Sequence, residues 1–145
     1  MSGKWITRQG AKVDRVACPW LVRKFIDPAA EFYFVPKDRL LAEAARLGAI
    51  PFDAEGVDLG HQGNDCSFET IIKRHGLTDP ALLEMAKIVH GADVKDPHPV
   101  PQAAGLLAIA EGMAATLPDD QEKLAKGFPI YDALYAWCES KVAAR

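Results

Sequence analysis

Apolar residues in the first third of the chain are grouped in short runs that suit β-strands. A short strand is expected over residues 4–7, and a second over 31–36, where the run EFYFVP is rich in aromatic and branched side chains. A third extended segment, AIPFD, is expected over 49–53. Together these segments predict a small sheet near the N-terminus.

Helical spacing of apolar residues separates these strands. The segment 14–26, DRVACPWLVRKFI, is expected to form a helix, with Pro19 tolerated only near its first turn. The segment 37–48 repeats leucine and alanine at helical spacing, and Gly48 stands where a helix-ending glycine belongs. The N-terminal third therefore alternates strand and helix.

The rest of the chain is dominated by helical periodicity. Ser67 is predicted to cap the first of these helices, Asp79 to open the second, and Gly127 to end a short capped segment over 119–127. The four longer helices are expected over residues 68–75, 81–90, 100–113 and 130–144. The pattern predicts an α+β fold, a helix-dominated single domain over residues 1–145 with a small N-terminal sheet.

Charge and hydropathy limit the function classes. The net charge is −3 and no polybasic tract occurs, which disfavours sequence-independent binding of nucleic acid. No apolar run is long enough to span a bilayer, and the first ten residues do not resemble a signal peptide. We therefore expect a soluble, cytoplasmic protein without membrane contact.

The cysteines argue against a disulfide framework. Cys18, Cys66 and Cys138 are three in number, have unrelated spacings and form no CxxC pair. A zinc site made of thiolates alone is disfavoured for the same reason. Any metal site in this chain needs histidine and carboxylate ligands.

The glycine-broken stretch LGHQGNDCSFET, residues 59–70, carries the first candidate site. His61 offers an imidazole, the usual ligand for transition metals, and Glu69 falls in the first turn of the following helix. The alternative is that His61 is a polar surface residue and that the helix dipole alone accounts for Glu69. Residue types do not decide between these interpretations.

The stretch IVHGAD carries the second candidate. His90 and Asp93 are three positions apart near a predicted helix end, and a continued helix would place both on one face. In the alternative, protonated His90 complements the helix C-terminus and Asp93 belongs to a turn.

The stretch DRVACPW carries the third candidate. Arg15 could bind an oxyanion through its forked guanidinium group, and Asp14 could pair with Arg15 or cap the helix. Cys18, close to a helix start, could be a redox thiol, although free cysteines are usually buried and inert.

Several blocks together resemble the chromate-resistance family of the ChrB type, whose domain is also known as chromate resistance exported protein. The blocks run in order over nearly the whole chain: DRVACPWLVRKFIDPAAEFYFVP, PFD, HQGNDCSFE, LLEMAKIVHGAD, AAGLLAIAEGM and YDALYAWC. The resemblance implies a bacterial protein linked to chromate tolerance. Longer relatives carry a separate N-terminal region and are regarded as chromate-responsive regulators, so we expect no DNA binding by this chain alone.

The family blocks contain the polar groups singled out above. We therefore predict one metal site made by His61, Glu69 and Asp93, with His90 or Cys66 as a fourth ligand. A histidine with two carboxylates suits Mn, Fe or Zn.

Three functions remain open at this stage. The first is a metal-binding domain in chromate or oxidative-stress tolerance, whether or not it is an enzyme. The alternative is an oxyanion-sensing or protein-binding regulatory module without catalysis, in which Arg15 and basic residues such as Arg23 or Lys73 bind chromate. The third is thiol chemistry at Cys18 or Cys66. The small-residue stretch AAGLLAIA is either core or the interface of a homodimer.

Overall fold

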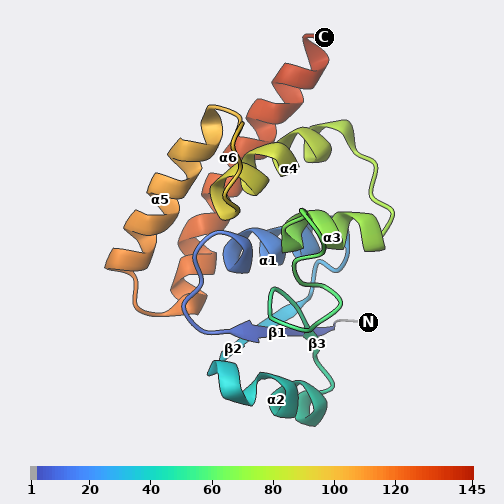
Figure 1. Cartoon of the computed structure of the whole chain (residues 1–145), viewed down its shortest axis with the longest axis vertical. Coiled ribbons are helices and arrows are strands. Elements are labelled where there is room, and N and C mark those ends of the chain that lie inside the picture. Colours follow the sequence, from blue (N-terminus) through green and yellow to red (C-terminus); the bar gives the residue numbers. More distant parts are fainter. Residues whose placement is uncertain (1–2) are drawn as a thin grey trace.

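The computed structural model describes residues 3–145 and shows a small parallel sheet with most of the helices on one side and a single short helical segment on the other (Figure 1). The strands are β1 (Lys4–Arg8), β2 (Glu31–Val35) and β3 (Ile50–Pro51). The helices are α1 (Asp14–Phe25), the 3₁₀ helix η1 (Lys37–Arg39), α2 (Leu40–Leu47), α3 (Ser67–Arg74), α4 (Pro80–Asp93), α5 (Gln102–Thr116) and α6 (Asp120–Ala143). The predicted α+β class is confirmed.

The sheet has the strand order β2-β1-β3, and both pairings are parallel. Successive side chains of a strand point to opposite faces. Trp5 accordingly joins the main core, whereas Ile6 packs with Leu40 and Ala44 of α2 in a smaller cluster. The sheet is thus covered by α2 on one face and by the helical layer on the other (Figure 1).

The helical layer is built around α1 and α4. Helix α1 packs against α3 and α6, and α4 packs against α5 and α6. Trp20 of α1 is nearly fully buried, with its ring centroid 6.4 Å from that of Tyr131 and 5.7 Å from that of Tyr135. These aromatic contacts join the N-terminal and C-terminal parts of the chain into one core.

Three predicted helix boundaries are wrong, those at Gly127, Ser67 and Gly91, and the two errors at glycines have packing reasons. Helix α6 runs through Gly127 and Pro129 instead of ending at Gly127. A Cβ on Gly127 would lie 2.9 Å from Cγ1 of Val16, so this glycine permits close helix contact. The N-cap of α3 is Cys66, and Ser67 is the first helical residue.

Helix α4 continues past His90 to Asp93 because Gly91 serves packing and does not end the helix. A Cβ on Gly91 would lie 2.7 Å from Cβ of Ala103, so the glycine lets α5 approach. The final turn of α4 therefore carries both His90 and Asp93. The predicted helix end at Gly48 is confirmed by a left-handed φ of 65°.

The segment between β3 and α3 folds back onto the sheet edge. A parallel bridge joins Leu59 to Phe52, and Asp53 N donates to Leu59 O at 3.0 Å. This fold-back brings His61 close to the residues that follow β3. Within residues 3–145, no helix combines the length and apolar character needed to cross a membrane.

Candidate metal centre

Four acidic or imidazole side chains meet beside the C-terminal end of the parallel sheet. Asp53 follows β3 directly, and Asp14 opens the helix that follows β1. His61 comes from the fold-back loop and Asp93 from the last turn of α4. Sites in parallel α/β structures form at this strand end because the connecting loops converge there.

His61 faces three carboxylates. Its Nε2 lies 3.1 Å from Oδ2 of Asp93, 3.5 Å from Oδ1 of Asp53 and 3.9 Å from Oδ2 of Asp14. The His61 side chain is 48% exposed, whereas that of Asp14 is fully buried. His61 is thus the most exposed member of the group and Asp14 the most buried.

Asp14 lies at the bottom of this group. Its Oδ2 accepts a hydrogen bond from Ser67 N at 2.8 Å, while its buried Oδ1 has no hydrogen-bond partner. Burial, followed by repulsion from Asp93 and Asp53, raises the pKa of Asp14 well above its usual range. The hydrogen bond from Ser67 N therefore offsets only part of the cost of ionising Asp14, and a cation would offset more of it.

Asp53 and Asp93 are held differently. Asp53 accepts from Ser67 Oγ at 2.7 Å and pairs with Arg15 Nη1 at 3.3 Å. Its φ of 45° lies in the left-handed region, which aspartate tolerates better than most residues. Burial and the charge of Asp53 raise the pKa of Asp93, and His61 opposes that rise.

An open cavity of about 480 Å³ adjoins the acidic group. Arg15 donates from Nη2 to Gly10 O at 2.6 Å, and the buried Nε atoms of Arg8 and Arg15 have no partner. The residues that line the cavity are Arg8, Arg15, Asp53, Ala54, Glu55, Gly56, His61 and Asp93. The cavity therefore presents cationic and acidic groups side by side.

The other basic residues considered for an oxyanion site lie outside this cavity. Arg23 donates to Ala30 O at 3.0 Å and lies over the ring of Phe32, and Lys73 pairs with Asp65. Arg8, at the end of β1, is the basic residue that sequence reasoning missed here.

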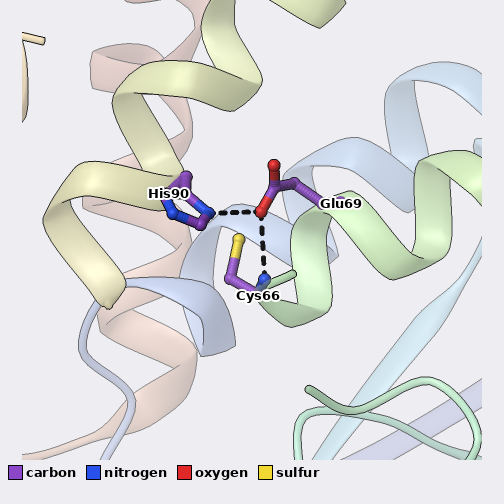
Figure 2. Close-up of side chains that lie close together, drawn as sticks. All are labelled: Cys66, Glu69 and His90. Atoms are coloured by element: carbon purple, nitrogen blue, oxygen red, sulfur yellow. Dashed lines mark hydrogen bonds and ion pairs between the residues drawn. The ribbon is translucent and has the colours of Figure 1, made fainter. Parts of the chain in front are cut away.

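A second polar group lies at the start of α3. Oε1 of Glu69 accepts from Cys66 N at 3.0 Å and lies 2.5 Å from Nδ1 of His90 (Figure 2). The sulfur of Cys66 points toward the same space between Glu69 and His90 (Figure 2). Glu69 thus reaches back to the preceding loop, as its position in the first helical turn allows.

The residues of the predicted metal site are divided between two groups of ligand atoms. Asp14, His61 and Asp93 form one group, and Cys66, Glu69 and His90 form the other. In each group the ligand atoms lie within 4.8 Å of one another. The structure therefore brings His61 and Asp93 together and places Glu69 with the two residues considered as a fourth ligand.

Asp14 and Asp53 were not predicted as site residues. Asp14 was interpreted as a helix cap or a partner of Arg15, but Arg15 pairs with Asp53. Asp53 ends the predicted strand over 49–53 and Asp14 follows the one over 4–7, so the rule that sites gather at the carboxyl ends of parallel strands could have found them. That rule requires the strand direction, which the apolar pattern does not give.

The three cysteines lack the features of activated thiols. Cys18, Cys66 and Cys138 are all buried. Burial is the largest cause that raises the pKa of each thiol, to about 11 for Cys138, and the charge of Asp14 adds to the rise for Cys18 and Cys66. Reactive thiols require the opposite, an electropositive and accessible setting.

Comparison with known sequences identifies the family. The family described as "ChrB, C-terminal domain" matches residues 5–138. The chain belongs to the ChrB C-terminal domain family. It is 37% identical over 133 residues to Protein ChrB of Cupriavidus metallidurans, covering 91% of this chain but 40% of that protein. The ChrB C-terminal domain described here thus spans about two-fifths of its relative, and no solved structure matches it.

Proposed function

We propose that this ChrB C-terminal domain binds a divalent transition metal through Asp14, His61 and Asp93 and acts in chromate resistance. The observation that carries the proposal is the carboxylate of Asp14: its buried Oδ1 has no hydrogen-bond partner, and the residue supplies one of three ligand atoms that lie within 4.8 Å of one another. Uncompensated buried carboxylates are costly, and a bound cation removes that cost.

The donor set indicates which metals fit. One imidazole and two carboxylates are borderline-to-hard ligands that suit Mn, Fe or Zn. Ser67 holds two of the surrounding carboxylates, those of Asp14 and Asp53, through its backbone N–H and its hydroxyl. Such supporting hydrogen bonds orient metal ligands and tune their basicity.

The adjoining cavity supports an oxyanion next to the metal. Arg8 and Arg15 line it, and each has a buried Nε without a partner. Guanidinium groups bind tetrahedral oxyanions through charge-assisted hydrogen bonds. The family's link to chromate tolerance favours chromate as this oxyanion. Chromate binding here is compatible with either a catalytic or a regulatory role.

Elemental analysis tests the metal proposal. The purified domain, loaded separately with Mn²⁺, Fe²⁺ and Zn²⁺ and then desalted, should retain metal at this site. His61→Ala should lose about one equivalent of that metal, whereas His98→Ala, which alters an exposed histidine outside both ligand groups, should not. Equal metal content in His61→Ala and the unaltered domain, for every metal, would refute the proposal.

Calorimetry tests the oxyanion part. Chromate should bind to the metal-loaded domain with a larger heat than sulfate, and Arg8→Gln should weaken the binding about tenfold or more, the loss of one charge-assisted contact. Unchanged chromate affinity in Arg8→Gln would remove Arg8 from the site. Absence of heat with either anion would remove the oxyanion from the proposal.

A further inference from the structure

We propose that Cys66, Glu69 and His90 form a second cation site, beside the first and distinguished from it by a thiolate ligand. A site with sulfur, imidazole and carboxylate donors selects a softer ion than the all-nitrogen-and-oxygen site does. Zn²⁺ is the divalent ion that most commonly accepts this donor mixture. The proposal concerns different ligand atoms from the proposed function and does not depend on it.

The two helix ends that form this group hold its ligands in place. Cys66 is the N-cap of α3, Glu69 lies in the first turn of that helix, and His90 lies in the last turn of α4. Figure 2 shows the three side chains directed into one space. Ligand atoms in a tetrahedral zinc site lie about 3–4 Å apart, given metal–ligand bonds of about 2.0–2.3 Å. Here the three atoms lie within 4.8 Å of one another, so small shifts suffice.

The orientation of His90 matches that of a metal ligand. Its Nδ1 faces Glu69, and its Nε2 lies 3.7 Å from Oδ2 of Asp96. Ligating histidines usually direct the second ring nitrogen to a carboxylate, which fixes the tautomer and raises ligand basicity. Asp96 would take that supporting role after a small approach, since 3.7 Å exceeds hydrogen-bond distance, and Nδ1 would exchange its contact with Glu69 for the metal.

A capping box with an ion pair is the simpler interpretation, but it does not account for the whole group. The box needs Glu69 and a good acceptor at the N-cap, for which serine, threonine, asparagine or aspartate is preferred over cysteine. Both contacts of Glu69 are made by Oε1, which leaves Oε2 available to a ligand. The Cys66 side chain accepts from the backbone N–H of Glu69 as one half of the box, so the second carboxylate oxygen is the atom that capping leaves unexplained.

The second group lies beside a cavity that also borders the first group. A cavity of about 360 Å³ is lined by His61 and His90, together with residues of the loops that follow them. His90 and Asp93 share the last turn of α4, and Cys66 and Ser67 are adjacent at the start of α3. His90 belongs to the second group and Asp93 to the first, while Ser67, next to Cys66, donates its backbone N–H to Asp14 of the first group. The two groups are therefore neighbours.

Cobalt spectroscopy tests the second site on the intact domain. Co²⁺ bound to a thiolate gives a sulfur-to-metal charge-transfer absorption in the near ultraviolet, which nitrogen and oxygen ligands do not give. We expect this band in the unaltered domain, in His61→Ala and in Cys138→Ser, whose altered sulfur belongs to neither ligand group. Cys66→Ser should lose the band and keep its fold, because serine is a better N-cap.

The outcomes separate this proposal from the proposed function. A band that persists in His61→Ala supports the second site even if the first binds no metal. Three results would overturn the proposal: no band in the unaltered domain with Co²⁺ in excess, an unchanged band in Cys66→Ser, or a band abolished by His61→Ala. A second variant, His90→Gln, should lower the affinity for Co²⁺, followed by the charge-transfer absorption, at least tenfold. An unchanged affinity would exclude His90 as a ligand.

Discussion

His61 and Asp93, which are far apart in the sequence, lie with Nε2 and Oδ2 3.1 Å apart. The contact joins the loop before α3 to the last turn of α4. In the metal-free domain it is a hydrogen bond or ion pair, and in our account a cation would sit between these atoms and those of Asp14. The same two side chains would then act as ligands without a large movement of either element.

Asp14→Asn should make the metal-free domain more stable at neutral pH. The pKa of Asp14 is raised in the folded state, so at any pH above the usual pKa of aspartate its ionisation lowers the free energy of unfolding. Removing the charge relieves that cost. The asparagine can still accept from Ser67 N through its amide oxygen. Thermal unfolding in the presence of a chelator should show a higher Tm for the variant.

The same variant should lose metal-dependent stabilisation. Saturating metal should raise the Tm of the unaltered domain by several degrees and that of Asp14→Asn much less, since ligand binding stabilises the folded state. Asp38→Asn, at an exposed position in η1, should respond to metal as the unaltered domain does. A metal response that survives in Asp14→Asn would show that Asp14 is not a ligand.

Ser67→Ala should weaken metal binding without removing a ligand. The hydroxyl donates to Asp53 at 2.7 Å inside the buried group, and such supporting contacts are typically worth about 10–100-fold in metal affinity. Titration with Zn²⁺ of the Cys66→Ser domain, which retains only the first site, measures the effect. Ser140→Ala, on the exposed face of α6, is the control, and equal affinities in both variants would contradict the role assigned to Ser67.

The native thiols should be unreactive at pH 8. All three cysteines are buried, and each pKa is raised, to about 11 for Cys138, so the thiolate fraction is very small. An aromatic disulfide reagent should label no cysteine in the folded domain and three after denaturation in urea. Rapid labelling of Cys18 or Cys66 in the folded domain would revive the hypothesis of thiol chemistry.

Much of the fold could be predicted from local patterns. The strands near residues 4, 31 and 50, the cap at Asp79 and the turn at Gly48 depend on neighbouring residues, and the structure confirms them. The errors at Gly91 and Gly127 have a non-local cause. Each glycine resembles a helix end in sequence but allows close contact with a distant element, Ala103 or Val16.

Substituting those glycines separates packing from helix propensity. Gly91→Ala should lower the free energy of unfolding by about 1–3 kcal/mol, because its Cβ would lie 2.7 Å from that of Ala103. Gly105→Ala, where a Cβ meets nothing within 4 Å, should stabilise the domain by about 0.4–1 kcal/mol. Urea denaturation measures both changes, and stabilisation by both substitutions would contradict the packing of α5 on α4.

The candidate site was less accessible to sequence reasoning. His61 and Asp93 were paired because each stood in a polar break of a recognisable block, and the structure does place them in contact. The assignment of Glu69 to the same group depended on which way the first turn of α3 faces, and that turn faces His90. Asp14 and Asp53 required the parallel strand order, a tertiary property that no local pattern contains.

The most direct test of the central claim is a crystal structure of the domain soaked in Mn²⁺ or Zn²⁺, with diffraction data collected above the metal's absorption edge. Our account predicts an anomalous peak about 2.0–2.2 Å from Nε2 of His61 and from one carboxylate oxygen each of Asp14 and Asp93. A map without a peak there, with His61 and Asp93 in direct hydrogen-bond contact at saturating metal, would contradict it.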